Sequence, residues 1–234
     1  MNNDTFIERL FPLLITGDRP AARAVVAEAI TSGWTPEQVA TDGFWPVLES
    51  INALYREDQL TNLAHHYATR LLRSMVDQVQ AGYTNKTSRN KTVHLFCGPS
   101  EADDLAAQIV ADLCEADGYS VRFGGGGIAG DEILAEVNER KPDVLVMFSS
   151  APSDAPHIRG IIDTIRSVDA CPDLQIAVGG GIFNRVDGLA EEIGADIWAS
   201  SPDDMLYEME HSADRRATPD QRTVGRTVRN SKAA

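Results

Sequence analysis

Residues 93–110 read VHLFCGPSEADDLAAQIV, and this stretch sets the architecture of the whole chain. A short, mainly apolar run, residues 93–97, leads into Gly98 and Pro99. Ser100 then opens an acidic first helical turn with apolar positions at helical spacing behind it. This order predicts a strand, a tight loop and a helix N-terminus. Such a junction projects backbone N–H groups and the positive end of a helix dipole over the carboxyl edge of a sheet, so we expect a ligand there.

The second half of the chain repeats this unit. Further strands are expected at residues 120–123, 144–148, 174–178 and 196–199, each followed by a helical pattern. Strands that alternate with helices predict an α/β fold with a flavodoxin-like, doubly wound, five-stranded parallel sheet. The predicted strand ends carry small or polar residues, as a site for a large ligand requires; they are glycines at 124–127, Ser149-Ser150 and glycines at 179–181.

The first half has only helical periodicity. Apolar residues recur at spacings of three and four, and short polar turns separate the segments, so residues 1–81 predict a helical bundle that caps the second half. The polar segment 82–91, GYTNKTSRNK, is expected to be a linker. Residues 92–211 then form the α/β domain, and residues 212–234 are expected to be a disordered basic tail.

Composition narrows the functional classes. A net charge of −14 disfavours direct binding of nucleic acid by the folded body. No apolar run reaches the roughly 20 residues that span a bilayer, and no signal-peptide pattern opens the chain. The three cysteines are far apart in sequence and indicate buried thiols of a cytoplasmic protein. A protein partner is expected, and the oligomeric state stays open, with a dimer among the options.

The common phosphate-binding motifs are absent. No GxGxxG follows the first strand and no GxxxxGK[ST] occurs. The sequence therefore lacks the phosphate-binding loop of a nicotinamide dinucleotide site and that of a P-loop protein. A response regulator needs an Asp at the end of its third strand, where this chain has Ser149 and Ser150. The sequence therefore does not predict phosphate transfer.

Two parts of the chain resemble a known family. Residues 15–69, which begin ITGDRPAARAVV, resemble the helical cap of cobalamin-binding modules, and the second half is similar to their Rossmann-like domain. The positions that carry the second resemblance are residues 101–106 at the family's DxHxxG motif, Ser149 or Ser150 after the third strand, Gly179-Gly180 after the fourth strand, and Gly194-Ala195-Asp196. The resemblance implies a tetrapyrrole between cap and domain, cobalamin first, with haem or a biliverdin-type bilin as alternatives.

The chain differs from the family at the position of the residue that ligates the metal. The family's DxHxxG histidine ligates cobalt from below, but the matching position here is Asp103, with Glu101 before it and Ala106 at the glycine. A carboxylate is a hard oxygen donor and a poor match for cobalt in a corrin. In the light-sensing cobalamin repressors, which the cap resembles, a Trp and a Glu-His pair face the upper side of the ring. The matching residues are Tyr55, His65 and His66, so we expect His66, or else His65, to be the metal ligand.

These features predict a sensory or regulatory protein rather than an enzyme. It would bind a tetrapyrrole and signal light, redox state or cofactor level to a partner, such as a transcription regulator or signalling protein. Two alternatives remain open: a corrinoid carrier of a methyltransferase system, and a cofactor-free interaction module. The site residues expected around the ring are Tyr55, His65, His66, Glu101, Asp103, Ser149, Ser150, Gly179 and Gly180.

Overall fold

The cap of the computed structural model is helical, and the structure describes residues 1–218 of the chain. Its elements are α1 (Asn3–Thr16), α2 (Arg19–Thr31), α3 (Pro36–Gln38), the π-helical turn η1 (Val39–Phe44), α4 (Trp45–Arg56) and α5 (Asn62–Gln80). Side-chain caps begin α2 and α5: Asp18 accepts a hydrogen bond from the Ala21 N–H, and Thr61 accepts one from the Ala64 N–H. Gly17 ends α1 at φ 73°, a left-handed conformation that glycine adopts without strain.

The second half of the chain is a five-stranded parallel sheet, which confirms the predicted fold class. The strands lie in the order β2-β1-β3-β4-β5 and are β1 (Thr92–Cys97), β2 (Ser120–Gly126), β3 (Val144–Phe148), β4 (Gln175–Gly179) and β5 (Ile197–Ala199). The connecting segments are α6 (Glu101–Ala116), α7 (Gly130–Arg140), η2 (Pro152–Asp154), α8 (Ala155–Val168), α9 (Gly181–Arg185), α10 (Leu189–Glu192) and α11 (Pro202–His211).

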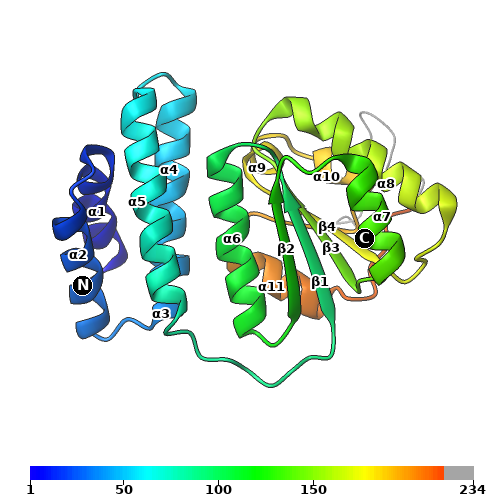
Figure 1. Cartoon of the computed structure of the whole chain (residues 1–234), viewed down its shortest axis with the longest axis horizontal. Helices are drawn as coiled ribbons and strands as arrows, with labels where there is room; N and C mark the ends of the chain where they lie inside the picture. Colours follow the sequence, from blue (N-terminus) through cyan, green and yellow to red (C-terminus); the bar gives the residue numbers. More distant parts are fainter. Residues whose placement is uncertain (219–234) are drawn as a thin grey trace, which may run out of the picture.

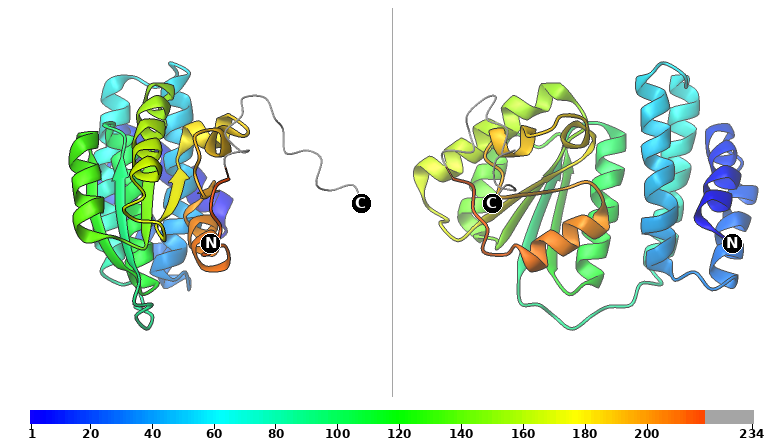
Figure 2. Two further views of the ribbon diagram at one scale, coloured as in Figure 1. Left: turned by 90° about the vertical axis from the view of Figure 1, so that its right-hand side faces the viewer. Right: turned by 180° about the vertical axis from the view of Figure 1, so that it is seen from behind.

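Helices cover both faces of the sheet. Val146 and Ala177 point to the face that packs on α6 and α11, while Leu145 and Ile176 point to the face that packs on α7 to α10. In Figure 1, α6 stands between the sheet and the cap helices α4 and α5, and the views of Figure 2 agree. The cap core and the α6 face of the sheet form one continuous apolar cluster. The cap is therefore packed against the domain through α6.

The second strand is longer than predicted and includes three of the four glycines at 124–127. β2 continues through Gly126 beside β1. A Cβ on Gly124 would lie 2.5 Å from the Phe96 ring, and a Cβ on Gly126 would lie 2.3 Å from the Gly98 carbonyl oxygen. The glycines thus permit the close approach of β2 to β1.

Two short helices, α9 and α10, follow β4 in place of one long crossover helix. Gly188, at φ 79°, precedes α10 in a left-handed conformation that breaks the helical path between them. In the cap, α3 runs through η1 directly into α4.

The linker is fixed to the domain along residues 82–91. Lys86 and Arg89 both pair with the buried carboxylate of Asp117, and Arg89 also lies 3.1 Å from Glu210. The Thr84 N–H donates to Glu37 of the cap at 2.6 Å. The linker therefore ties the C-terminal end of α6 to the cap, and Figure 1 shows its course below both.

The start of the predicted tail is ordered. The Gln175 side-chain amide donates to the Ser212 carbonyl at 2.7 Å, and the Ala217 N–H donates to Asp196 at 2.6 Å. These hydrogen bonds hold the start of the tail against the sheet. The composition of the tail alone could not predict them, because the partners Gln175 and Asp196 lie elsewhere in the chain. The rest of the tail lies outside the described residues. Within residues 1–218, none of the helices combines the length and the apolar character needed to cross a bilayer.

Candidate functional site

A cavity of about 540 Å³ lies between the cap and the carboxyl edge of the sheet. We call it the cap–sheet cavity. Its volume is within the range of about 300–1,000 Å³ that is usual for ligand sites. Its wall combines cap residues with residues from the start of α6, the segment after β3 and the end of α9. The lining residues are Asn52, Tyr55, Arg56, His65, Ser100, Ala102, Asp103, Ser150, Ala151, Pro152 and Arg185.

Tyr55 and His65 form the cap side of this cavity. Their rings stack with centroids 4.0 Å apart and planes 19° apart, since α4 and α5 run side by side. The Tyr55 hydroxyl donates to Asn62 at 2.8 Å, and the His65 Nε2 lies 3.4 Å from the Asn52 side-chain oxygen. Burial lowers the pKa of His65, so its imidazole is neutral at neutral pH. A neutral imidazole is the form that ligates metals.

His66 is oriented differently from its neighbour. Its Nδ1 lies 3.2 Å from the Glu101 carboxylate, and 53% of its side chain is exposed. Neither His66 nor Glu101 lines the cap–sheet cavity. Successive helical residues point about 100° apart, so only one of the two histidines can face the ring site. The geometry favours His65, whereas the sequence had placed His66 first.

Asp103 occupies the position of the family's histidine and lines the cavity. It is 2% exposed. The Ser100 hydroxyl donates to its carboxylate at 2.8 Å, and its own N–H donates to the Ser100 oxygen at 3.0 Å. Ser100 thus caps α6, and the Asp103 carboxylate accepts the hydroxyl of that cap in the first helical turn, where a negative charge also interacts favourably with the helix dipole.

The two serines after β3 have different surroundings. Ser149 is fully buried, and its hydroxyl donates to Asp154 at 2.8 Å, away from the cavity lining. Ser150 lines the cavity. Only Ser150 is therefore placed to touch a ligand there.

The glycines after β4 border a second, smaller hollow, which we call the inner slot. It measures about 100 Å³ and is lined by Trp45, Leu48, Glu49, Asn52, Arg56, Ala106, Ser150, Gly180, Gly181, Asn184 and Arg185. Gly179 faces the Phe148 ring, 2.9 Å from where a Cβ would stand, and Trp45 packs edge-on against the same ring at 6.4 Å. These rings occupy the space beside the ends of β3 and β4.

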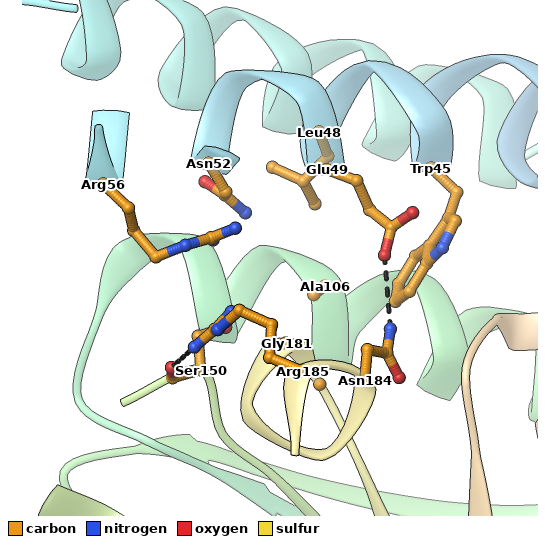
Figure 3. A pocket seen from close by; sticks show the side chains of 11 residues that line it. Trp45, Leu48, Glu49, Asn52, Arg56, Ala106, Ser150, Gly181, Asn184 and Arg185 are labelled. Atoms are coloured by element: carbon orange, nitrogen blue, oxygen red, sulfur yellow. Dashed lines mark hydrogen bonds between the residues drawn. The ribbon is translucent and has the colours of Figure 1, made fainter. Parts of the chain in front are cut away.

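Two arginines at this site were missed by the sequence analysis. Arg56, at the end of α4, and Arg185, at the end of α9, line both the cavity and the slot. In Figure 3 the Arg56 side chain extends from the cap and the Arg185 side chain from the domain into the same gap, and the Arg185 guanidinium is directed at the Ser150 carbonyl. The sequence signal was weak: Arg56 follows the expected ring residue Tyr55, and Arg185 follows the double glycine by five positions.

The remaining three histidines lie elsewhere, and one of them, His211, is exposed at the end of α11. His157 lines an apolar pocket of about 240 Å³ beside β1, β3 and α8, and His94 is buried within β1. Across the part of the chain that the structure describes, no group of three or more His, Cys, Asp or Glu side chains is arranged to hold a metal ion.

Comparisons with known proteins agree with the two-part architecture. Residues 92–206 and residues 6–80 each match a family described as "B12 binding domain". The trimethylamine corrinoid protein of Methanosarcina barkeri is 20% identical over 89% of this chain and 96% of its own length. The monomethylamine corrinoid protein 1 of Methanosarcina mazei is 19% identical over 86% of this chain and 94% of its own length.

A solved structure shares the fold. The monomethylamine corrinoid protein of Methanosarcina barkeri superposes with a TM-score of 0.75 at 15% identity, covering 89% of this chain and 99% of that one. The relatives found are thus corrinoid proteins, not light-sensing regulators, and the expected photoreceptor role gains no support from them.

Proposed function

The chain pairs a B12-binding cap with a Rossmann-like B12-binding domain, and on this premise we propose that it is a corrinoid carrier protein of a methyl-transfer system. Its cofactor is a corrinoid, cobalamin. The observation that carries the proposal is the cap–sheet cavity, which lies where the two matched parts of the chain meet. The protein holds the cofactor and is not itself a catalyst. A cytoplasmic methyltransferase is the expected partner.

The residues present fit a corrinoid held mainly by the cap. The flat Tyr55–His65 pair suits contact with a flat macrocycle, and Asn52 positions the His65 ring through its side-chain oxygen. Bound cobalamin supplies a cobalt centre that can carry a methyl group. The role of the chain's own residues is to orient the ring and to keep water from the face that the cap covers.

The residues do not fit an imidazole ligand on the lower face. Asp103 offers only a carboxylate there, and its oxygens already accept the Ser100 hydroxyl. No step of the proposed function therefore depends on a protein ligand from the β1–α6 loop. His65 is the imidazole best placed to reach a metal, from the cap side.

Regulation by a bound tetrapyrrole is the second candidate. It is favoured by one observation, the Asp103 carboxylate at the position where a carrier of the family has histidine. Light breaks the cobalt–carbon bond of alkylcobalamins, so a light sensor should change state when it is illuminated.

The two candidates can be separated with the intact chain. The protein is loaded with methylcobalamin in the dark, and its mass is measured by light scattering before and after illumination. A carrier should retain one equivalent in the dark and keep the same mass after illumination. A light-driven change in oligomeric state would overturn the carrier proposal in favour of the sensor.

A further inference from the structure

Two guanidinium groups lie close together between the cap and the domain. Arg56 comes from α4 of the cap, and Arg185 comes from α9 of the domain. Both line the cap–sheet cavity and the inner slot, and Figure 3 shows them extending into the same gap. Two like charges side by side at a partly enclosed site repel each other.

Glu49 and Asp103 lie near enough to attract Arg56 and Arg185 respectively, but no carboxylate makes a direct ion pair with either arginine among the described residues. Arg185 donates one hydrogen bond to the Ser150 carbonyl at 2.5 Å. The chain has 14 more acidic than basic residues by formal charge, so surplus carboxylates are available elsewhere on the molecule. The two arginines therefore lack an ion-pair partner even though the chain as a whole has an excess of acidic residues.

The carboxylates nearest to the pair are occupied. Glu49 accepts a hydrogen bond from Asn184 at 3.5 Å, and burial raises its pKa against the opposing effects of this bond and of the Arg56 charge. Asp103 accepts the Ser100 hydroxyl. Burial and the charge of Arg56 lower the pKa of Arg185, yet an arginine stays protonated at any physiological pH. The repulsion can thus be relieved by an anion but not by loss of a proton.

Neutral donors lie beside the two arginines. The Ser150 hydroxyl and the Asn52 amide border both hollows, and the structure gives the Ser150 hydroxyl no hydrogen bond within residues 1–218. Two guanidinium groups, a hydroxyl and an amide offer more donors than the two oxygens of a carboxylate can accept. A phosphate group has more acceptor oxygens than a carboxylate and can therefore accept hydrogen bonds from more of these donors. Arginine guanidinium groups also bind phosphate through bidentate hydrogen bonds.

We propose that Arg56 and Arg185 together bind a phosphate group that bridges the cap and the domain. The phosphate belongs either to free inorganic phosphate or to the nucleotide arm of the corrinoid. The first source is independent of the proposed function, and the second rests on it. In both cases the anion joins the two halves of the site and holds the cap closed over the cavity.

The first arm of the test uses the full chain without corrinoid. Inorganic phosphate is titrated by calorimetry at constant ionic strength into the wild type, Arg56→Gln, Arg185→Gln and the control Arg23→Gln, which removes an exposed cap arginine from α2. If free phosphate is the ligand, each site variant should weaken binding about tenfold or more, as expected for losing a charge-assisted contact, while the control binds normally.

The second arm compares cobalamin with cobinamide, which has the same macrocycle but no phosphate-containing nucleotide. If the phosphate is the corrinoid's own, the site variants should lose affinity for cobalamin about tenfold and keep their affinity for cobinamide. Arg185→Lys, which keeps the charge but not the planar fork, should lie between wild type and Arg185→Gln and guards against a folding defect. The proposal is overturned if neither phosphate nor cobalamin affinity distinguishes the site variants from Arg23→Gln. Loss of cobinamide affinity as well would refute the phosphate assignment while leaving corrinoid binding intact.

Discussion

Replacing Asp112 with Asn should stabilise the protein at neutral pH and lose this effect in acid. Asp112 lies on α6 and lines a polar cavity of about 190 Å³ beside the start of the linker. One of its carboxylate oxygens and the Tyr83 hydroxyl are buried there without a hydrogen-bond partner among the described residues. Burial, helped by repulsion from Asp77 and Glu115, raises the pKa of Asp112 to about 6.

The magnitude follows from this pKa. A rise from the ordinary value of 3.8 to about 6 corresponds to about 3 kcal/mol at 1.36 kcal/mol per pKa unit. Asp112 is only partly buried as a residue, so screening by water reduces the expected effect to roughly 1–2 kcal/mol. Because the folded-state pKa is raised, the carboxyl costs nothing below pH 3.8. Its cost grows between pH 3.8 and about 6 and is complete above that.

The assay is urea unfolding of the wild type, Asp112→Asn and the control Glu8→Gln at a series of pH values. Glu8 is exposed on α1 and is not among the charges that raise the pKa of Asp112, so its substitution removes one charge from solvent and should have little effect. Asp112→Asn should gain roughly 1–2 kcal/mol of unfolding free energy at pH 7.5 and none at pH 4. A gain of equal size at both pH values would refute the electrostatic explanation, since a new hydrogen bond of the amide would then account for it.

Three further substitutions address the site. With cobalamin bound, His65→Ala should alter the visible spectrum and His66→Ala should not, because only His65 lines the cavity; the opposite order would reject cap ligation by His65. The double change Asp103→His with Ala106→Gly restores the family motif and should give nitrogen hyperfine coupling from the protein in the paramagnetic resonance of the Co(II) form, and its absence would show that the loop geometry cannot reach the metal. Gly180→Val should lower the melting temperature by the equivalent of at least about 1–3 kcal/mol, because a Cβ there meets a backbone oxygen at 2.4 Å and φ is 99°; an unchanged melting curve would disprove the strain.

The fold was largely readable from the sequence because its signals are local. The apolar segment 144–148 became β3 with the predicted bounds, and the helix predicted after Ser100 begins at Glu101. The extent of β2 could not be predicted at the glycines 124–127. A glycine run after a strand and one inside a closely packed strand look alike in sequence, and the contacts of Gly124 with the Phe96 ring and of Gly126 with the Gly98 backbone appear only in the structure.

The site was less readable because it depends on contacts across the cap–domain interface. The family position identified Tyr55, His65 and Asp103, and all three line one cavity. The choice between His65 and His66 depended on the rotation of α5, which no local pattern reveals. Arg56 and Arg185 are separated by more than a hundred residues, so only the three-dimensional structure brings them together.

Titration of the purified full-length chain with hydroxocobalamin, followed by visible absorbance, is the most direct test of corrinoid binding in the cap–sheet cavity. The spectrum should change saturably at one equivalent per chain. The change should weaken when Tyr55 or His65 is replaced by Ala, and it should persist in His66→Ala. No spectral change at excess cofactor, or equal binding by the wild type and both cavity variants, would contradict the assignment of the cavity as the cofactor site.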